Sequence, residues 1–145
     1  MKAPAGRVAA VDYGRRRIGV ALSDPGRVLA LPHATIANRP PETEPPAELL
    51  AVLQEAEAVE IVIGIPFHMD GREGDMAAEA RAFGRQLAER SGLPVHERDE
   101  RLSSAEAARR LREAALPRRR REEKGRLDRL AAAVLLEDFL AEHGR

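Results

Sequence analysis

A nearly unbroken apolar run, Glu-Ile-Val-Ile-Gly-Ile-Pro at residues 60–66, lies near the middle of the chain. A strand with one face in water alternates apolar and polar side chains, whereas a strand that is apolar on both faces must be covered on both sides. The run is therefore predicted to be an inner strand of a sheet with helices on both faces. That arrangement is the α/β class of fold.

Three shorter segments before residue 40 predict an antiparallel meander. Residues 7–12 form an apolar run that ends at Asp12, and apolar runs follow at 18–22 and 28–36. A Gly-containing turn separates the first two, and Asp-Pro-Gly at 24–26 separates the second from the third. Strands joined by turns this short pair side by side and run in opposite directions.

Beyond residue 46 the pattern alternates between helix and strand. Helices are predicted over residues 47–58, 75–90, 103–117 and 126–142, a strand over 95–98 and a charged loop over 118–125. Right-handed crossovers place the later strands parallel to the first. The expected sheet has five strands, three in an antiparallel meander plus two parallel ones, and residues 1–145 are expected to form a single domain.

Composition narrows the classes of function. The chain has no cysteine, so any metal ion must be bound by oxygen or imidazole ligands. No apolar stretch has the length of a membrane span or a signal peptide, so we expect a cytoplasmic protein with no membrane partner. The formal net charge is +0, but residues 101–129 carry ten Arg and one Lys against five acids. One face is therefore expected to be strongly positive and to favour an anionic partner.

Acidic residues follow the strand ends that this topology brings together. Asp12 ends the first strand, Asp99 and Glu100 follow the last, and Asp128 lies in the first turn of the predicted final helix. Ligands of such sheets bind beyond the carboxyl ends of the parallel strands. Cleavage of phosphodiesters by two metal ions requires carboxylates that hold hard cations about 3.5–4 Å apart. We predict that Asp12, Asp128 and Glu100 hold Mg²⁺ or Mn²⁺, with Asp99 as the alternative to Glu100 and as a fourth candidate catalytic residue.

Each acid also has an ordinary structural explanation. Asp12 could be a turn former at a strand end, and Asp128 could interact with the dipole of its helix. Asp99 and Glu100 point to opposite faces if the strand continues that far, so only one need face the site. Among the four histidines, His68 is the one that we consider for a role in the site, because it follows the buried strand.

Basic residues close to these acids are the candidate nucleic-acid contacts. Phosphate contacts by basic side chains bind nucleic acid without regard to sequence, although a charge run can also be only a solvated surface. Three arginines follow Asp12, one follows the acidic pair, and five basic residues lie in the predicted loop. They are Arg15, Arg16, Arg17, Arg101, Arg118, Arg119, Arg120, Arg121 and Lys124.

Four motifs carry a resemblance to a known family. They are Val-Asp-Tyr-Gly-Arg-Arg-Arg-Ile-Gly-Val-Ala-Leu-Ser-Asp at 11–24, Ile-Gly-Ile-Pro at 63–66 with Met-Asp-Gly at 69–71, Asp-Glu-Arg-Leu-Ser-Ser at 99–104, and Lys-Gly at 124–125 with Asp128, Ala131 and Ala132. In this order, and over nearly the whole chain, they resemble the YqgF/RuvX family of RNase H-like nucleases.

The resemblance implies an RNase H-like fold, a divalent-metal site and Asp12, Glu100 and Asp128 in the catalytic positions. It also implies an endonuclease that matures the 5′ end of precursor 16S ribosomal RNA or resolves Holliday junctions. In contrast to RuvC-type resolvases, the buried strand ends at Gly64-Ile65-Pro66 without a carboxylate. Asp99 or Glu100, from a later strand, must then replace it.

Other functions stay open at this point. Asp12-x-Gly14 followed by a hairpin is also similar to the phosphate loop of sugar kinases and actin-like ATPases, although those proteins need two lobes. A non-catalytic RNA-binding or ribosome-assembly module would use the same basic residues. The residues do not decide between ribosomal precursor RNA and branched DNA, or between a monomer, which suffices for a ribonuclease, and a homodimer, which suits a resolvase.

Overall fold

The computed structural model describes residues 6–39, 44–67, 70–100 and 121–143. In chain order its elements are β1 (Arg7–Asp12), β2 (Arg17–Ser23), β3 (Ala30–Ala37), α1 (Ala47–Glu55), β4 (Ala58–Ile65), α2 (Asp75–Ser91), β5 (Val95–Asp99) and α4 (Arg121–Glu142). The helix predicted over residues 103–117 lies outside the described residues. In the described part, no helix has the length and apolar character needed to cross a bilayer.

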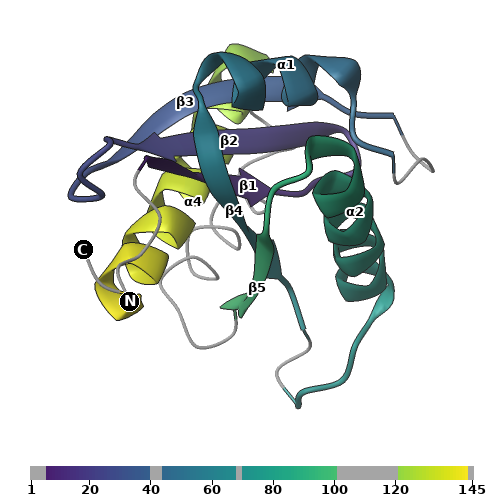
Figure 1. Ribbon diagram of the computed structural model, residues 1–145. Helices are drawn as coiled ribbons and strands as arrows, with labels where there is room; N and C mark the ends of the chain where they lie inside the picture. The colour runs from purple at the N-terminus through teal and green to yellow at the C-terminus, as the bar shows by residue number, and fades with distance from the viewer. Residues whose placement is uncertain (1–5, 40–43, 68–69, 101–120, 144–145) are drawn as a thin grey trace.

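The strands form one sheet in the order β3-β2-β1-β4-β5. β2 pairs antiparallel with both β1 and β3, and β4 pairs parallel with both β1 and β5. In Figure 1, α1 and α2 lie on one face of the sheet and α4 crosses the other. The predicted mixed sheet with helices on both faces is therefore confirmed.

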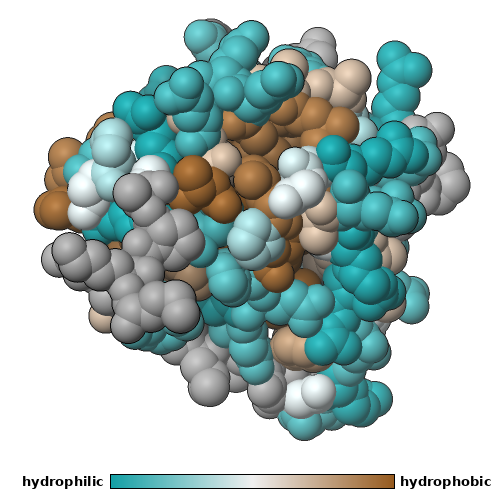
Figure 2. All heavy atoms as spheres, in the orientation of Figure 1, coloured by the Kyte–Doolittle hydropathy of each residue, from teal (hydrophilic) through white to brown (hydrophobic). Residues whose placement is uncertain are grey.

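Alternate residues of the strands face two separate cores, which fixes the direction of every side chain near the strand ends. On one face, Val11 and Ile63 pack with Phe83 and Leu87 of α2. On the other face the strands contribute smaller residues, among them Val8, Ala10, Ala21 and Val62, which pack with Leu135, Leu136 and Phe139 of α4. Figure 2 views the first face, where the outer surfaces of α1 and α2 are hydrophilic and apolar residues gather between them.

The start of α4 differs from the sequence prediction. The helix begins at Arg121 instead of 126, so the segment 121–125, expected as part of a loop, is helical. Glu122 and Glu123 in its first turn interact favourably with the helix dipole. Gly125 does not end the helix, because it lies where α4 contacts β3: the Thr35 hydroxyl donates a hydrogen bond to the Gly125 carbonyl at 2.6 Å.

Smaller differences concern two other element starts. β3 begins at Ala30, two residues later than expected, and Val28 and Leu29 are 54% and 55% exposed in the preceding turn. Asp75 is the first residue of α2 rather than its cap, since Gly74 is the N-cap and no side chain caps the helix. At the other end, Gly92 adopts a left-handed φ of 72° and ends α2 as predicted.

Candidate functional site

Asp12 is the last residue of β1 and is 4% exposed. Because Val8 and Ala10 of the same strand pack against α4, alternation places the Asp12 side chain on the α4 face of the sheet. Its pairing partner on β2 is Gly19. On the β4 side, Val11 pairs with Ile63, which puts Gly64 beside Asp12. A buried carboxylate thus lies between two glycines.

Glu100 reaches this position from the end of β5, one strand farther away. A Cβ atom added to Gly64 would lie only 2.7 Å from Cδ of Glu100, so the carboxyl group of Glu100 lies directly over Gly64. Glu100 is 2% exposed. Its carboxylate therefore lies on the α4 face, over the residue next to Asp12.

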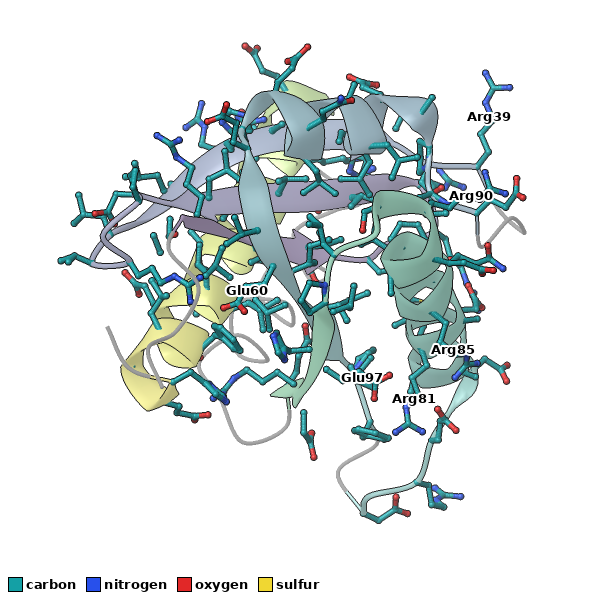
Figure 3. All side chains as sticks on the ribbon, viewed as in Figure 1. Arg39, Glu60, Arg81, Arg85, Arg90 and Glu97 are labelled. Atoms are coloured by element: carbon teal, nitrogen blue, oxygen red, sulfur yellow. The ribbon has the colours of Figure 1, made fainter. Side chains whose placement is uncertain are left out.

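The direction of the β5 side chains separates Glu100 from Asp99. Arg81 of α2 and Glu97 of β5 lie together in Figure 3, and Arg81 Nε donates to Glu97 at 3.2 Å. His96 instead faces α4, where its ring centre is 5.5 Å from that of Phe139. Strand alternation therefore directs Asp99, like Glu97, to the α2 face.

Asp128 approaches Asp12 from the opposite side, on α4. A Cβ atom added to Gly19 would lie 2.6 Å from the backbone carbon of Asp128, so α4 contacts β2 directly at this residue. Asp128 is the eighth residue of α4 and not part of its first turn, and it is 3% exposed. The helix dipole acts mainly on the first turn and does not account for an acid at this place.

The three acids consequently occupy one face of the sheet over neighbouring strands. Their side chains are not arranged as ligands, however: among the described residues, no three His, Cys, Asp or Glu side chains are grouped to hold a metal ion. Arg17 Nε donates to Asp128 Oδ2 at 2.6 Å. Asp12 and Glu100 also have interaction partners.

The turn between β1 and β2 is held from two sides. Tyr13 Oη donates to Glu79 of α2 at 3.2 Å, and the Arg15 guanidinium binds both oxygens of the same carboxylate. Burial, followed by the charge of Glu79, raises the pKa of Tyr13 to about 12. The hydrogen bond from Arg15 lowers the pKa of Glu79. On the other side, the Asn38 side chain donates to the Gly14 carbonyl at 2.9 Å.

The remaining candidate contacts have different surroundings. Arg16 is exposed and Lys124 is partly buried. Arg101, Arg118, Arg119, Arg120 and His68 lie outside the described residues, and only the backbone of Arg121 is described, at the start of α4. Glu79 and Asn38 were not predicted, since no local pattern distinguishes them and only the tertiary structure brings them to the turn.

Comparisons with known proteins agree with this architecture. The family model described as "RuvX: Holliday junction resolvase" matches residues 6–142. A relative from Anaeromyxobacter sp. (strain Fw109-5), named "Putative pre-16S rRNA nuclease", is 44% identical over 134 residues, covering 92% of this chain and 96% of its own. A relative of the same name from Koribacter versatilis (strain Ellin345) is 39% identical over 147 residues, covering 99% and 94%.

Among solved structures, RuvC of T. thermophilus in complex with a Holliday junction substrate has a TM-score of 0.56 at 21% identity, with 96% of each chain covered. At that identity the likeness concerns the fold, and it confirms the RNase H-like class. The family model spans nearly all of the sequence, and the two relatives match this chain over most of their own lengths. The chain therefore belongs to the RuvX family.

Proposed function

We propose that this chain is a divalent-metal-dependent endonuclease that hydrolyses phosphodiester bonds during maturation of the 5′ end of precursor 16S ribosomal RNA. The relatives' names support the substrate. The observation that carries the chemistry is the approach of Asp12, Glu100 and Asp128, all less than 5% exposed, to one face of the sheet. Burying several carboxylates together is costly unless cations neutralise them.

The residues fit Mg²⁺ or Mn²⁺ in donor chemistry, and they share one face of the sheet, although their side chains must turn toward one another to form a group of three ligands. Carboxylate oxygens are the ligands that these hard cations prefer. Gly19 and Gly64 lack the Cβ atoms that would keep Asp128 and Glu100 away from Asp12. Asp12, Glu100 and Asp128 are thus the proposed ligands, with Asp99 directed elsewhere. When bound, such an ion would supply Lewis-acid stabilisation of the charge on the scissile phosphate and its leaving oxygen.

The protein side chains would hold and orient the RNA backbone. Arg16, in the turn that follows Asp12, is exposed and is proposed to bind a phosphate, and Lys124 of α4 is proposed as a further contact. Arg17, Arg101 and Arg118 to Arg121 are proposed contacts of the same kind. Arg15 could join them only by giving up its three hydrogen bonds to Glu79. Binding that depends on such contacts weakens steeply with salt.

Cleavage of a 5′-extended precursor 16S RNA with Mg²⁺ or Mn²⁺ tests the proposal. We expect Asp12→Asn, Glu100→Gln and Asp128→Asn each to lower the rate at least about 100-fold, since each removes a charge that acts at the reacting phosphate. Glu137→Gln is the matched control, because Glu137 is an exposed carboxylate on the same helix as Asp128. Cleavage by the Asp12→Asn variant at the wild-type rate would contradict the proposal.

Resolution of Holliday junctions is the second candidate function, favoured by the description of the matching family model. A four-way DNA junction assayed beside the RNA distinguishes the two, and a resolvase should be a homodimer because it addresses two strands symmetrically. A ribonuclease could act as a monomer, and its substrate would place it in the cytoplasm. RNA binding without cleavage by any preparation would identify a non-catalytic ribosome-assembly module instead.

A further inference from the structure

The Arg17 guanidinium forms an ion pair with the carboxylate of Asp128, which is one of the proposed metal ligands. Arg17 Nε lies 2.6 Å from Asp128 Oδ2, and the two side chains are 22% and 5% exposed. A charge-assisted hydrogen bond in such a shielded place is stronger than a surface ion pair. Within the described residues this contact accompanies the lack of any three-ligand group.

The two partners differ in how freely they can move. Asp128 is held in place because its backbone contacts Gly19 and because α4 packs into the buried core around Leu135. Thr35 of β3 fixes α4 further: its hydroxyl donates a hydrogen bond to the Gly125 carbonyl and accepts one from Arg129. Arg17 is the first residue of β2 and holds its guanidinium on a long flexible side chain that is partly in solvent. If the pair opens, Arg17 is therefore the partner that moves.

A carboxylate oxygen that accepts a hydrogen bond from a guanidinium is a poor ligand for a cation, because the two positive charges would be only a few ångströms apart and would repel each other. We propose that Arg17 and a divalent cation compete for Asp128. Metal binding then releases the Arg17 guanidinium, which becomes available to a substrate phosphate. This inference rests on the proposed metal-dependent function and assigns Arg17 two alternating partners.

Two consequences distinguish competition from a purely structural ion pair. Removing the guanidinium should strengthen metal binding, whereas loss of a structural pair would leave it unchanged or weaken it. The bound metal should also strengthen RNA binding, because it releases an arginine that can bind a phosphate. Since coupling between two ligands is reciprocal, RNA should strengthen metal binding by the same factor. Neither effect requires cleavage to be measured.

The test is titration of the full-length protein with Mn²⁺, followed by electron paramagnetic resonance of the free ion, without nucleic acid. We expect Arg17→Gln to bind Mn²⁺ about tenfold more tightly than wild type, within the usual range of coupling between sites. Arg15→Gln is the matched control: it removes the same charge two residues earlier in the chain, but the partner of Arg15 is Glu79. We expect that variant to stay within about twofold of wild type.

Three further measurements make the outcome decisive. Arg17→Lys keeps a cation but loses the planar guanidinium, so a smaller gain in the same direction is expected, and this variant keeps the test valid if Arg17→Gln does not fold. In an Asp128→Asn background the gain from Arg17→Gln should disappear. In the wild type, Mn²⁺ should strengthen binding of a non-hydrolysable RNA more than it does in Arg17→Gln.

An unchanged or weaker Mn²⁺ affinity in folded Arg17→Gln would overturn the competition, and so would an equal gain in Arg15→Gln. In both cases metal-dependent cleavage by the wild type would leave the proposed function standing. Absence of Mn²⁺ binding in every variant, together with absence of cleavage, would overturn both. The two failures are therefore distinguishable.

Discussion

Replacing Gly64 by alanine tests whether the position of Glu100 determines activity. The new Cβ atom would lie 2.7 Å from Cδ of Glu100 and still closer to its nearer carboxylate oxygen. Ordinary contact between two carbon atoms begins near 3.5 Å, so the carboxyl group has to retreat by roughly 0.8 Å. The backbone of Gly64 belongs to an inner strand of the sheet and cannot move away, so the Glu100 side chain has to move.

The size of the effect follows from that displacement. A shift of about 1 Å in a group that positions the reaction lowers a rate by about 100-fold, which corresponds to roughly 2.7 kcal/mol of transition-state stabilisation. Overpacking by a single methyl group costs about 1–3 kcal/mol of folding stability, and less where a side chain can rotate away. Gly64→Ala should therefore lose activity while most molecules remain folded.

The assay combines cleavage of precursor 16S RNA under single-turnover conditions with urea unfolding followed by circular dichroism. Gly84→Ala is the control, because its new Cβ atom would lie 3.4 Å from Ile63 on the opposite face of the same strand. The control should cleave at the wild-type rate. Wild-type cleavage by Gly64→Ala, in a folded protein, would refute the argument that Glu100 acts from its place over Gly64.

Three other predictions concern Gly19 of β2 and the contact between Tyr13 and Glu79 of α2. Gly19→Ala should lower the folding stability more than Gly64→Ala does, because its Cβ atom would lie 2.6 Å from the backbone carbon of Asp128 and α4 would have to shift. Urea unfolding should show a loss of about 1–3 kcal/mol in the free energy of unfolding. An unfolding midpoint equal to that of the wild type would contradict this. Glu79→Gln should lower the pKa of Tyr13 from about 12 while leaving it above 10, since burial is the largest cause of the shift. The wild type should lose the contribution of Tyr13 to stability as the pH rises from about 10 to 12, since the raised pKa favours the neutral phenol. Tyrosinate absorbance measures this pKa directly in a chain with one Tyr and no Trp, and a titration unaltered in Glu79→Gln would exclude the carboxylate as a cause.

The sheet was predictable because its signals are local. The apolar run at 60–66 indicated a strand covered on both faces, and β4 has the expected buried residues. The start of α4 was not predictable in this way. Gly125 resembles a helix terminator in the sequence, but within α4 its backbone carbonyl accepts a hydrogen bond from Thr35 of β3, and that contact depends on tertiary structure.

The sequence indicated that Asp12, Glu100 and Asp128 could approach one another, and the structure places them on one face of the sheet, but the details of their surroundings were not predictable. The proposed choice of Glu100 over Asp99 depends on which face of β5 turns toward α4. His96 packs near Phe139 of α4, and strand alternation places Glu100 on the same face as His96. The ion pair of Arg17 joins residues 111 positions apart. No spacing rule in the sequence relates such residues, so their pairing had to come from the structure.

The glycine at position 64 also accounts for the departure from RuvC-type resolvases that the sequence indicated. A carboxylate side chain on this residue of β4 would need the space that Glu100 fills from the end of β5, because even a Cβ atom there would overlap the Glu100 carboxyl group. In this chain the two arrangements exclude each other, because a side chain at position 64 and the Glu100 carboxyl group would need the same space. A glycine near the end of this apolar strand thus leaves room for the Glu100 carboxyl group, and the register of β1 and β4 places that glycine beside Asp12. This arrangement supports the proposal that Glu100 takes the place of the missing carboxylate.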